Sequence, residues 1–396
     1  DEDAVTSRIA SDLEVLNLHR TPLNCITLLK VFEVDFDESP INRPEMIKRV
    51  LFLLFNADDI PTYKTRPDLK DCEYVLGYFC ELLIRDESYS FTRDFFLKEI
   101  QRCCTERLID LEIQVVFDVL YENNILIKRG NTFNFKFAYW FYYFAARRMH
   151  HDENFAAFML EQMRYAQYPE LIEFYTGIDR RRDDALTILI RDIRACSDSV
   201  KNSCGLPNDM NPYKFAKWES SDETMQQMQD EISNGVRDSN LPAVIKDQYS
   251  DQAYNPARPY SQDIKSILAE HSFMGMMRTM RVGARALRNS DYVSPEIKRQ
   301  LLSEIMQCWE LSSKIVFIVL PILAEEGHAA YAGTRFILCG DPGDTPQERF
   351  FNLLTQTPSI IVSWCKDDLF SKKMGPLLIG QLKSKEIDDI SRHVLI

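Results

Sequence analysis

The chain has 396 residues and a formal net charge of −13, so its length suggests more than one domain and its charge makes it a poor general binder of nucleic acid. Hydrophobic residues make up 45% of the sequence, which excludes disorder along the whole chain. The ten cysteines form no C-x-x-C motif, and several lie in apolar helical patterns. We therefore expect free thiols in a reducing, cytoplasmic compartment and no metal site.

The N-terminal part of the sequence predicts helices that restart at prolines. Apolar periodicity marks helices over residues 3–19 and 23–33, and a third begins at Asn42-Arg43-Pro44. Pro22 suits the first helical position, because its fixed φ fits the helix and its missing N–H would have no partner there. Thr21 precedes it as the expected N-cap.

From residue 69 the pattern changes to a compact unit of three helices and two strands. Phenylalanines at 133, 135 and 137 alternate with polar residues, which is typical of a half-buried strand, and Gly130-Asn131 between two such runs indicates a hairpin. The expected elements are helices over 71–85, 92–104 (capped by Thr92) and 111–122, and strands over 125–129 and 132–137. Three helices closed by a β-hairpin predict a winged helix.

The rest of the chain also predicts helices, so the fold class is mainly α: a helical domain, a winged helix with a small β-hairpin, and a C-terminal helical region. Prolines, asparagines and serines between about 197 and 260 indicate a loose connector with one polar helix, Asp222 to Asn234. The longest mainly apolar run, Ile315 to Ala324, is about half the length that a bilayer requires, so we expect a buried helix and no membrane contact. The expected helices cover 139–149, 152–166, 169–176, 183–195, 261–289, 294–312, 313–330, 346–370 and 383–394.

One helix, within 271–289, carries an apolar stripe beside a row of arginines. Its apolar residues recur at helical spacing, which predicts a core face; they are Phe273, Met277, Met280, Ala284 and Leu287. Arg278, Arg281, Arg285 and Arg288 line an adjacent face. This row is our candidate partner-binding site, for an acidic ligand, a nucleic-acid backbone or an oligomer neighbour. The alternative is pairing with aspartates and glutamates of the same chain.

Catalytic and metal motifs are missing from the sequence. No G-x-x-x-x-G-K-[ST] occurs, and Gly340-Asp341-Pro342-Gly343-Asp344 has the wrong charge for phosphate and predicts an acidic turn. Adjacent His150 and His151 point about a third of a turn apart on a helix and cannot easily share one metal, so we expect a solvated helix end. We therefore expect no catalytic residue and no metal ligand in this chain.

The segment Asp179-Arg180-Arg181-Arg182-Asp183-Asp184 has two interpretations. Its arginines could bind an anion or an acidic partner, or they could pair with the neighbouring aspartates. Gly177 is expected to cap the helix before it, and Asp183 and Asp184 favour the N-terminus of the next helix.

Two stretches together resemble the region downstream of the P-loop in STAND-type NTPases (NACHT and related signalling ATPases). Arg20-Thr21-Pro22-Leu23-Asn24-Cys25-Ile26-Thr27-Leu28-Leu29 looks like the proline-plus-apolar helix of that family's small helical domain. Phe133-x-Phe135-x-Phe137 followed by Tyr143-Phe144-Ala145-Ala146 is similar to the strand-then-helix signature that ends its winged helix. The resemblance covers about residues 1–195.

The resemblance implies a domain order and a role. Residues 1–67 would form the small helical domain, 68–145 the winged helix, 146–200 a helical domain, 201–260 a polar connector and 261–396 a C-terminal sensor or interaction domain. The nucleotide, ATP or ADP with Mg, would be bound mostly by a P-loop domain that precedes Asp1 in the same protein, and this segment alone would bind none. The family reading implies a switch in prokaryotic defence or stress signalling that responds to a protein or nucleic-acid trigger and forms a homo-oligomer.

Carried over residue by residue, the resemblance makes Thr21 and Pro22 the candidate nucleotide contacts, with Pro22 near the adenine base. Two positions depart from the family pattern. Phe137 stands where the family has a phosphate-contacting histidine and cannot donate a hydrogen bond. Tyr142 stands at a glutamate position.

Two other functions remain open. One is a nucleotide-independent helical interaction scaffold. The other is a winged-helix transcription regulator, which places its third helix in the major groove of DNA. The third helix here, residues 111–122, contains no lysine or arginine, which argues against DNA readout.

Overall fold

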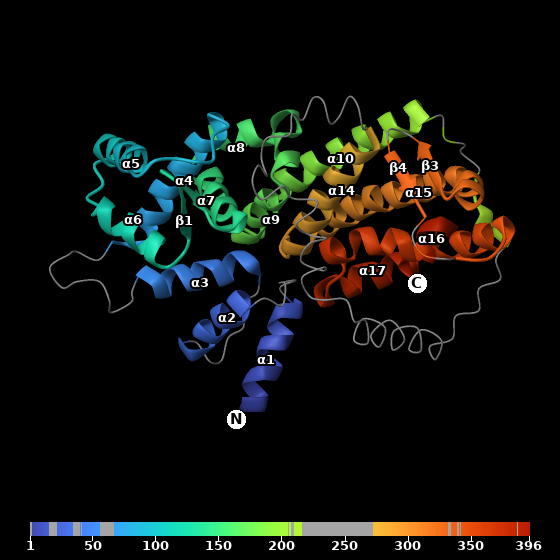
Figure 1. Ribbon diagram of the computed structural model, residues 1–396, viewed down its shortest axis with the longest axis horizontal. Helices are drawn as coiled ribbons and strands as arrows, with labels where there is room; N and C mark the ends of the chain where they lie inside the picture. The colour runs from blue at the N-terminus through green and yellow to red at the C-terminus, as the bar shows by residue number, and fades with distance from the viewer. Residues whose placement is uncertain are drawn as a thin grey trace. The chain divides into compact units, whose positions relative to one another are not determined.

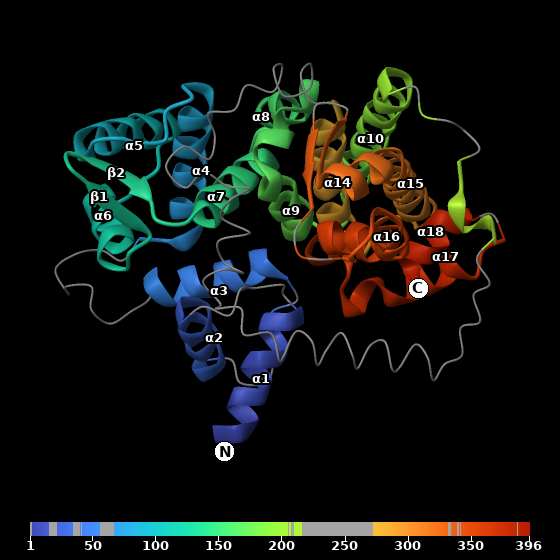
Figure 2. The same ribbon diagram turned by 45° about the vertical axis from the view of Figure 1, so that its right-hand side comes forward.

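The computed structural model describes residues 2–15, 22–34, 40, 42–55, 67–204, 206, 210–215, 272–331, 334–338, 340, 342–385 and 387–396. In this part of the chain the fold is mainly helical, with two small antiparallel hairpins (Figures 1 and 2). The chain divides into two compact units. The first contains the described residues up to Leu189 together with Arg285–Lys298, and the second contains the other described residues. The predicted mainly α fold is confirmed.

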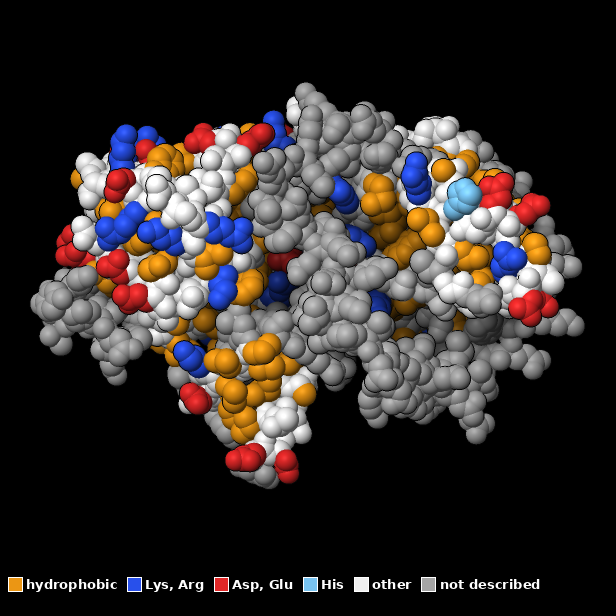
Figure 3. Space-filling model, viewed as in Figure 1, with side chains coloured by type: hydrophobic (Ala, Val, Ile, Leu, Met, Phe, Trp, Pro, Cys, Tyr) orange, Lys and Arg blue, Asp and Glu red, His pale blue; other side chains and the backbone are white. Residues whose placement is uncertain are grey.

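The first unit begins with the three predicted helices, α1 (Glu2–Val15), α2 (Pro22–Val34) and α3 (Arg43–Phe55). Ile9 and Leu13 of α1 are buried one helical turn apart, as the periodicity predicts. Figure 3 shows hydrophobic side chains gathered near the N-terminus, over α1 and α2, and two exposed residues of α2 are Ile26 and Leu29.

The three helices and the hairpin of the next segment follow in the expected order. Thr92 caps the second of them as predicted, because its hydroxyl accepts from the Phe95 N–H at 3.2 Å. Asp68 caps the first by accepting from the N–H groups of Lys70 and Asp71. The elements are α4 (Leu69–Arg85), α5 (Arg93–Arg107), α6 (Ile113–Glu122), β1 (Leu126–Arg129), β2 (Thr132–Phe135) and α7 (Ala138–His151).

The hairpin pairs Arg129 with Thr132 across a turn in which Gly130 has φ of +61°, a conformation that glycine adopts without steric cost. Phe133 also exchanges two backbone hydrogen bonds with Phe91, of 2.7 and 3.0 Å, and so ties the chain before α5 to the hairpin. The strand ends at Phe135, two residues earlier than predicted, because Phe137 has already become the N-cap residue of α7.

An aromatic cluster fills the space between these helices and the hairpin. Phe96 lies at its centre, with no exposed surface and ring centroids 4.9, 5.9 and 5.3 Å from those of Phe79, Phe91 and Phe117. Phe133 of the hairpin joins the cluster through an edge contact with Phe117. Aromatic edge and stacked contacts of this kind add to the stabilisation from buried area.

Leu108 occupies the C-cap of α5 in an unfavourable conformation. It has a left-handed backbone with φ of 55°, and its side chain is 93% exposed. For a residue with a Cβ this conformation costs roughly 1–2 kcal/mol, and glycine is the usual residue there. Leu108→Gly is therefore expected to raise the free energy of unfolding, measured by urea denaturation, by about 1 kcal/mol. The gain is reduced because glycine increases the conformational entropy of the unfolded chain. Leu108→Ala keeps the strain and should give no gain; equal gains in both variants would contradict the argument.

Helix α7 packs against α4 and α9 and is the central helix of the first unit. Buried ion pairs join α4 to α7: the carboxylate of Glu73 lies 2.9 Å from Arg147 and accepts from the Tyr143 hydroxyl, and Glu81 lies 2.6 Å from Arg148. The remaining elements of this part are α8 (Glu153–Leu160), the 3₁₀ segment η1 (Glu161–Gln167) and α9 (Pro169–Ile178).

The second unit has its own core. The apolar stripe predicted in 271–289 is buried, which confirms it as a core face; its members are Phe273, Met277, Met280, Ala284 and Leu287. The boundaries between the units fall within α10 (Asp183–Cys204), α14 (Ser272–Asn289) and α15 (Pro295–Glu326). The other elements are η2 (Pro212–Phe215), β3 (His328–Tyr331), β4 (Thr334–Ile337), α16 (Pro346–Leu369), η3 (Lys372–Met374), α17 (Gly375–Leu382) and α18 (Asp389–Leu395).

Helix α15 corrects two predictions. The expected break between residues 312 and 313 is wrong, because Ser312 is buried inside one continuous helix and its hydroxyl donates to the carbonyl of Cys308. By length and composition, this continuous helix could cross a membrane, whereas the run from Ile315 to Ala324 alone was expected to be too short. However, 72% of its most apolar stretch is buried inside the chain. Burial of this degree is typical of a core helix.

The C-terminal region differs from prediction at its hairpin and its last helices. Helix α15 ends at Glu326, Gly327 follows with φ of +76°, and β3 begins at His328 where a helix to residue 330 was expected. The predicted helix over 383–394 is confirmed only in its C-terminal part, where α18 follows its capping residue Asp388; α17 ends before the predicted range and was not expected. The polar helix predicted over Asp222 to Asn234, and most of the expected connector, lie outside the described residues.

The nine described cysteines are free thiols. Seven of them are buried, and burial raises the pKa of Cys104 to about 11 and that of Cys308 and Cys365 to about 12.

Candidate functional site

The candidate nucleotide contact Pro22 is the first residue of α2, and it is exposed. Its partner in the prediction, Thr21, lies outside the described residues. Phe137 is partly buried; its ring stacks on that of Tyr139, with centroids 5.4 Å apart, and lies 5.5 Å from the ammonium group of Lys136. Tyr142 is buried in α7. Both departures from the family pattern are therefore aromatic packing residues.

The predicted arginine row lies along α14, and its two C-terminal members pair with carboxylates of the first unit. Arg288 lies 3.0 Å from Glu173, and Arg285 lies 3.5 Å from Glu173 and 3.6 Å from Glu170. In the second unit, Arg281 lies 3.6 Å from Asp368. Internal pairing thus occupies three of the four arginines, and their role in partner binding stays a prediction.

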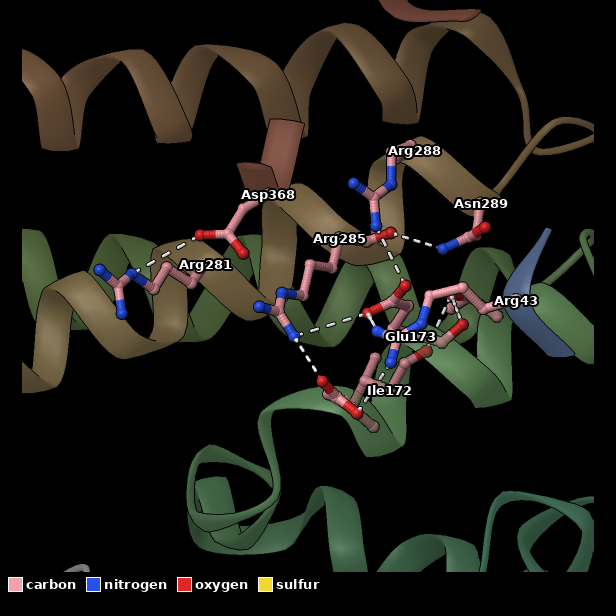
Figure 4. Close-up of polar contacts among 10 residues, drawn as sticks. Arg43, Ile172, Glu173, Arg281, Arg285, Arg288, Asn289 and Asp368 are labelled. Carbon is pink, nitrogen blue, oxygen red and sulfur yellow. Dashed lines mark hydrogen bonds and ion pairs between the residues drawn. The ribbon is translucent and has the colours of Figure 1, made fainter. Parts of the chain in front are cut away.

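Glu173 of α9 is the centre of a buried charge cluster that the sequence did not point to (Figure 4). Its side chain is 1% exposed and contacts three guanidinium groups: those of Arg285 and Arg288, and that of Arg43 in α3 at 3.3 Å. Arg43 also reaches Glu170, at 3.3 Å. We call these five residues the Glu173 cluster; they join α3, α9 and the C-terminal end of α14 within the first unit.

Within the Glu173 cluster, opposite charges offset the effect of burial on Glu173 and Arg43. Burial by itself raises the pKa of Glu173, but the attraction of Arg43, Arg288 and Arg285 outweighs burial and holds the pKa below its ordinary value. Burial lowers the pKa of Arg43, and the charges of Glu170 and Glu173 more than restore it. Glu173 and Arg43 therefore stay ionised at neutral pH in spite of their burial.

A side-chain-to-backbone hydrogen bond and a close contact beside the cluster hold α3 against α9. The Asn42 side-chain amide donates to the Gly177 carbonyl at 2.8 Å, and a Cβ on Gly177 would lie 2.7 Å from Cγ of Pro44. The prediction that Gly177 caps α9 is wrong: the residue lies inside the helix, which continues to Ile178. Its lack of a side chain serves close packing instead.

Gly177→Ala is expected to destabilise the chain by about 1–3 kcal/mol, because the added methyl group overlaps the ring of Pro44. A helical glycine in open space should respond in the opposite way, since alanine is the better helix former by roughly 1 kcal/mol. Gly380 of α17 is such a position, with no atom within 4 Å of an added Cβ. Thermal unfolding of both variants tests the argument, and a stabilised Gly177→Ala would refute the close contact.

The arginines at 180–182 are all paired. Arg181 and Arg182 contact the neighbouring Asp179 and Asp184, at 3.1 and 2.6 Å, as one of the two interpretations predicts. Arg180 instead reaches Asp291, at 2.8 Å, and donates to the hydroxyl of Tyr292.

The two histidines at the end of α7 differ from each other. The expectation of a solvated helix end is wrong for His150, which stacks on the ring of Tyr175 and donates from Nε2 to its carbonyl at 2.9 Å. Burial lowers the pKa of His150 to about 4. His151 is exposed. Within the described residues, no three metal-ligating side chains come together.

Part of the chain matches a known protein family. Residues 89–145 match the family described as Novel STAND NTPase 4. No curated protein and no solved structure matches the chain. The matched segment runs from the residues before α5, through α6 and the β1–β2 hairpin, into α7. It contains, up to Ala145, the strand-then-helix stretch that is one of the two on which the resemblance to STAND-type NTPases rests; the other, residues 20–29, lies outside the match. Over this segment, the chain is similar to the STAND NTPases.

Proposed function

We propose that the chain is the regulatory and sensor segment of a STAND-type ATP-dependent signalling switch in prokaryotic defence or stress signalling. The observation that carries the proposal is the family match over residues 89–145. The proposed layout is NACHT-like, with a small helical domain over 1–67 and a winged helix over 68–145. The later helical regions then respond to a protein or nucleic-acid trigger and promote homo-oligomerisation.

In this proposal the winged helix is a packing module. Helix α6 is its third helix, and its apolar face is buried in the aromatic cluster. The two charged side chains of α6 are those of Asp118 and Glu122, and both are acidic. A helix that reads DNA needs donors for phosphates and base edges, so its composition disfavours a transcription regulator.

The Glu173 cluster supplies a physical link between the proposed domains. Moving α3 away from α9 would separate Arg43 from Glu173 and leave a buried carboxylate with less compensation. The same carboxylate holds Arg285 and Arg288 of α14. A change in residues 1–67 is therefore expected to alter the charge balance around the C-terminal end of α14.

In this proposal, a P-loop domain of the same protein would make most of the contacts with ATP or ADP and Mg. The exposed ring of Pro22 fits the apolar face of a base. Phe137 lacks a hydrogen-bond donor for phosphate, so this chain offers no phosphate ligand at the family's histidine position. The role we assign to Pro22 is to position the base.

The test is ADP binding by the protein translated from its complete reading frame, followed with a fluorescent ADP analogue. Pro22→Glu should weaken binding by about tenfold, which corresponds to about 1.4 kcal/mol. Pro346→Glu is the matched control, because Pro346 is also the exposed first residue of a helix, α16. A reading frame without a P-loop, or a protein that does not bind ADP, would sink the proposal and favour the nucleotide-independent scaffold.

A further inference from the structure

Arg278 differs from the other arginines of α14. It is half-buried, and among the described residues it forms no hydrogen bond or ion pair. Burial, followed by repulsion from Arg281, lowers its pKa. A guanidinium group held partly out of water without a carboxylate lowers stability, because its lost hydration is not replaced.

The neighbouring Arg281 is only partly satisfied. Its Nε lies 3.6 Å from a carboxylate oxygen of Asp368, which is beyond hydrogen-bond distance, and this Nε has no hydrogen-bond partner in the part of the chain that the structure describes. Its Nη2 donates to the Trp364 carbonyl at a long 3.4 Å. Two adjacent guanidinium groups thus keep donors available on one face of α14.

Apolar side chains lie beside these donors. Met274 precedes Arg278 by four residues and Arg281 by seven, so the three share one helical face, and Met274 is 39% exposed. Trp364 of α16 is partly exposed and contacts the ring of Phe273 on α14. Arginine, tryptophan and methionine side by side are the composition that protein interfaces favour.

We propose that Arg278 and Arg281, with Met274 and Trp364, form a contact surface for an acidic segment of a partner protein that carries an apolar side chain next to its carboxylate. A carboxylate accepts two parallel hydrogen bonds from a guanidinium group, and the apolar side chain would cover Met274 and Trp364. The chain's net charge of −13 disfavours a long polyphosphate such as nucleic acid more than a short peptide with few charges. The proposal deepens the sensor role and rests on it, but binding to this surface requires no nucleotide.

The test uses the whole chain without nucleotide and two labelled peptides, one of repeating Asp-Glu-Leu-Ser units and one of repeating Asn-Gln-Leu-Ser units. Fluorescence anisotropy should show binding of the acidic peptide only. Arg278→Met should weaken that binding by about tenfold. Arg181→Met removes the same charge from an exposed arginine that is paired with Asp179, and should leave binding unchanged. Arg278→Met should also raise the melting temperature, because it removes a partly buried charge without a partner.

Four results would each overturn the inference. They are failure of the chain to bind the acidic peptide, equal weakening by Arg181→Met, tighter binding of single-stranded oligodeoxythymidine through Arg278, and a lower melting temperature of Arg278→Met. The last result would make Arg278 a structural residue. Failure of ADP binding in the complete protein would leave the peptide result intact, so the two proposals can fail separately.

Discussion

Glu173→Gln is expected to lower the free energy of unfolding by about 3–5 kcal/mol, measured by urea denaturation at neutral pH. The substitution keeps the size of the side chain but removes its charge, so three arginines at the Glu173 cluster lose a buried counter-ion. Removing one partner of a buried ion pair has effects of this size, since the remaining charge stays out of water without compensation.

Glu170→Gln is the matched control. Glu170 contacts Arg43 and Arg285 from the rim of the same cluster, but its side chain is 21% exposed and water can replace part of the lost interaction. Its loss should cost about 1 kcal/mol. If the two variants are equally stable, the buried position of Glu173 does not have the energetic role that we assign to it.

The contribution of the Glu173 cluster can also be measured through the pH dependence of the free energy of unfolding. The folded-state pKa of Glu173 lies below its ordinary value of 4.5, so its stabilisation is present above that pH and is lost as the pH falls through the folded value. Glu173→Gln should therefore flatten the stability curve below about pH 4.5. His150 also makes the chain less stable as the pH falls, but between about pH 6.5 and pH 4. Its pKa falls from 6.5 to about 4 on folding, because folding favours its neutral form.

Phe96→Ala is expected to destabilise the matched segment by about 3–5 kcal/mol. Phe96 has no exposed surface and contacts three other phenylalanine rings, so its removal leaves a cavity between α4, α5 and α6, next to the residue that bonds to the hairpin, Phe91. Hydrogen exchange should show the amides of β1 and β2 losing protection before those of α14 and α15, which belong largely to the other unit.

Tyr121→Ala is the control for this cavity. Tyr121 touches the same cluster from outside and is 43% exposed, so its loss should cost much less than that of Phe96. Uniform loss of protection in both units after Phe96→Ala would instead mean that the segment and the second unit unfold as one cooperative body.

Local signals in the sequence were sufficient to predict most of the helices and their ends. Thr92 could be recognised as a cap because the hydroxyl bonds to the backbone three residues away, an interaction that depends on local sequence alone. Asp183 and Asp184 mark the start of α10 for a similar reason, since negative charge favours a helix N-terminus. The apolar stripe of α14 was predictable because 3.6-residue spacing has one geometric outcome.

The centre of the candidate site was not predictable, because it depends on segments far apart in the sequence. Glu173 lies within Pro-Glu-Leu-Ile-Glu-Phe-Tyr, where nothing local reveals that Arg43 and Arg288 will surround it. Gly177 could be read as a cap until Pro44 is placed against it. Arg278 and Arg285 looked equivalent in the sequence, and the carboxylates that pair with one but not with the other come from distant helices.

The burial of most cysteines allows alkylation to report when the core of the chain becomes accessible to solvent. Cys25 of α2 and Cys204 at the end of α10 are partly exposed, whereas the other seven described thiols are buried. Alkylation requires both access and a thiolate, and burial withholds both at Cys308 and Cys365. Among the described cysteines, a brief pulse of iodoacetamide followed by mass spectrometry would therefore mark Cys25 and Cys204 in the folded chain. Any condition under which Cys308 is modified would identify, without engineered labels, the moment at which the core of the second unit becomes accessible.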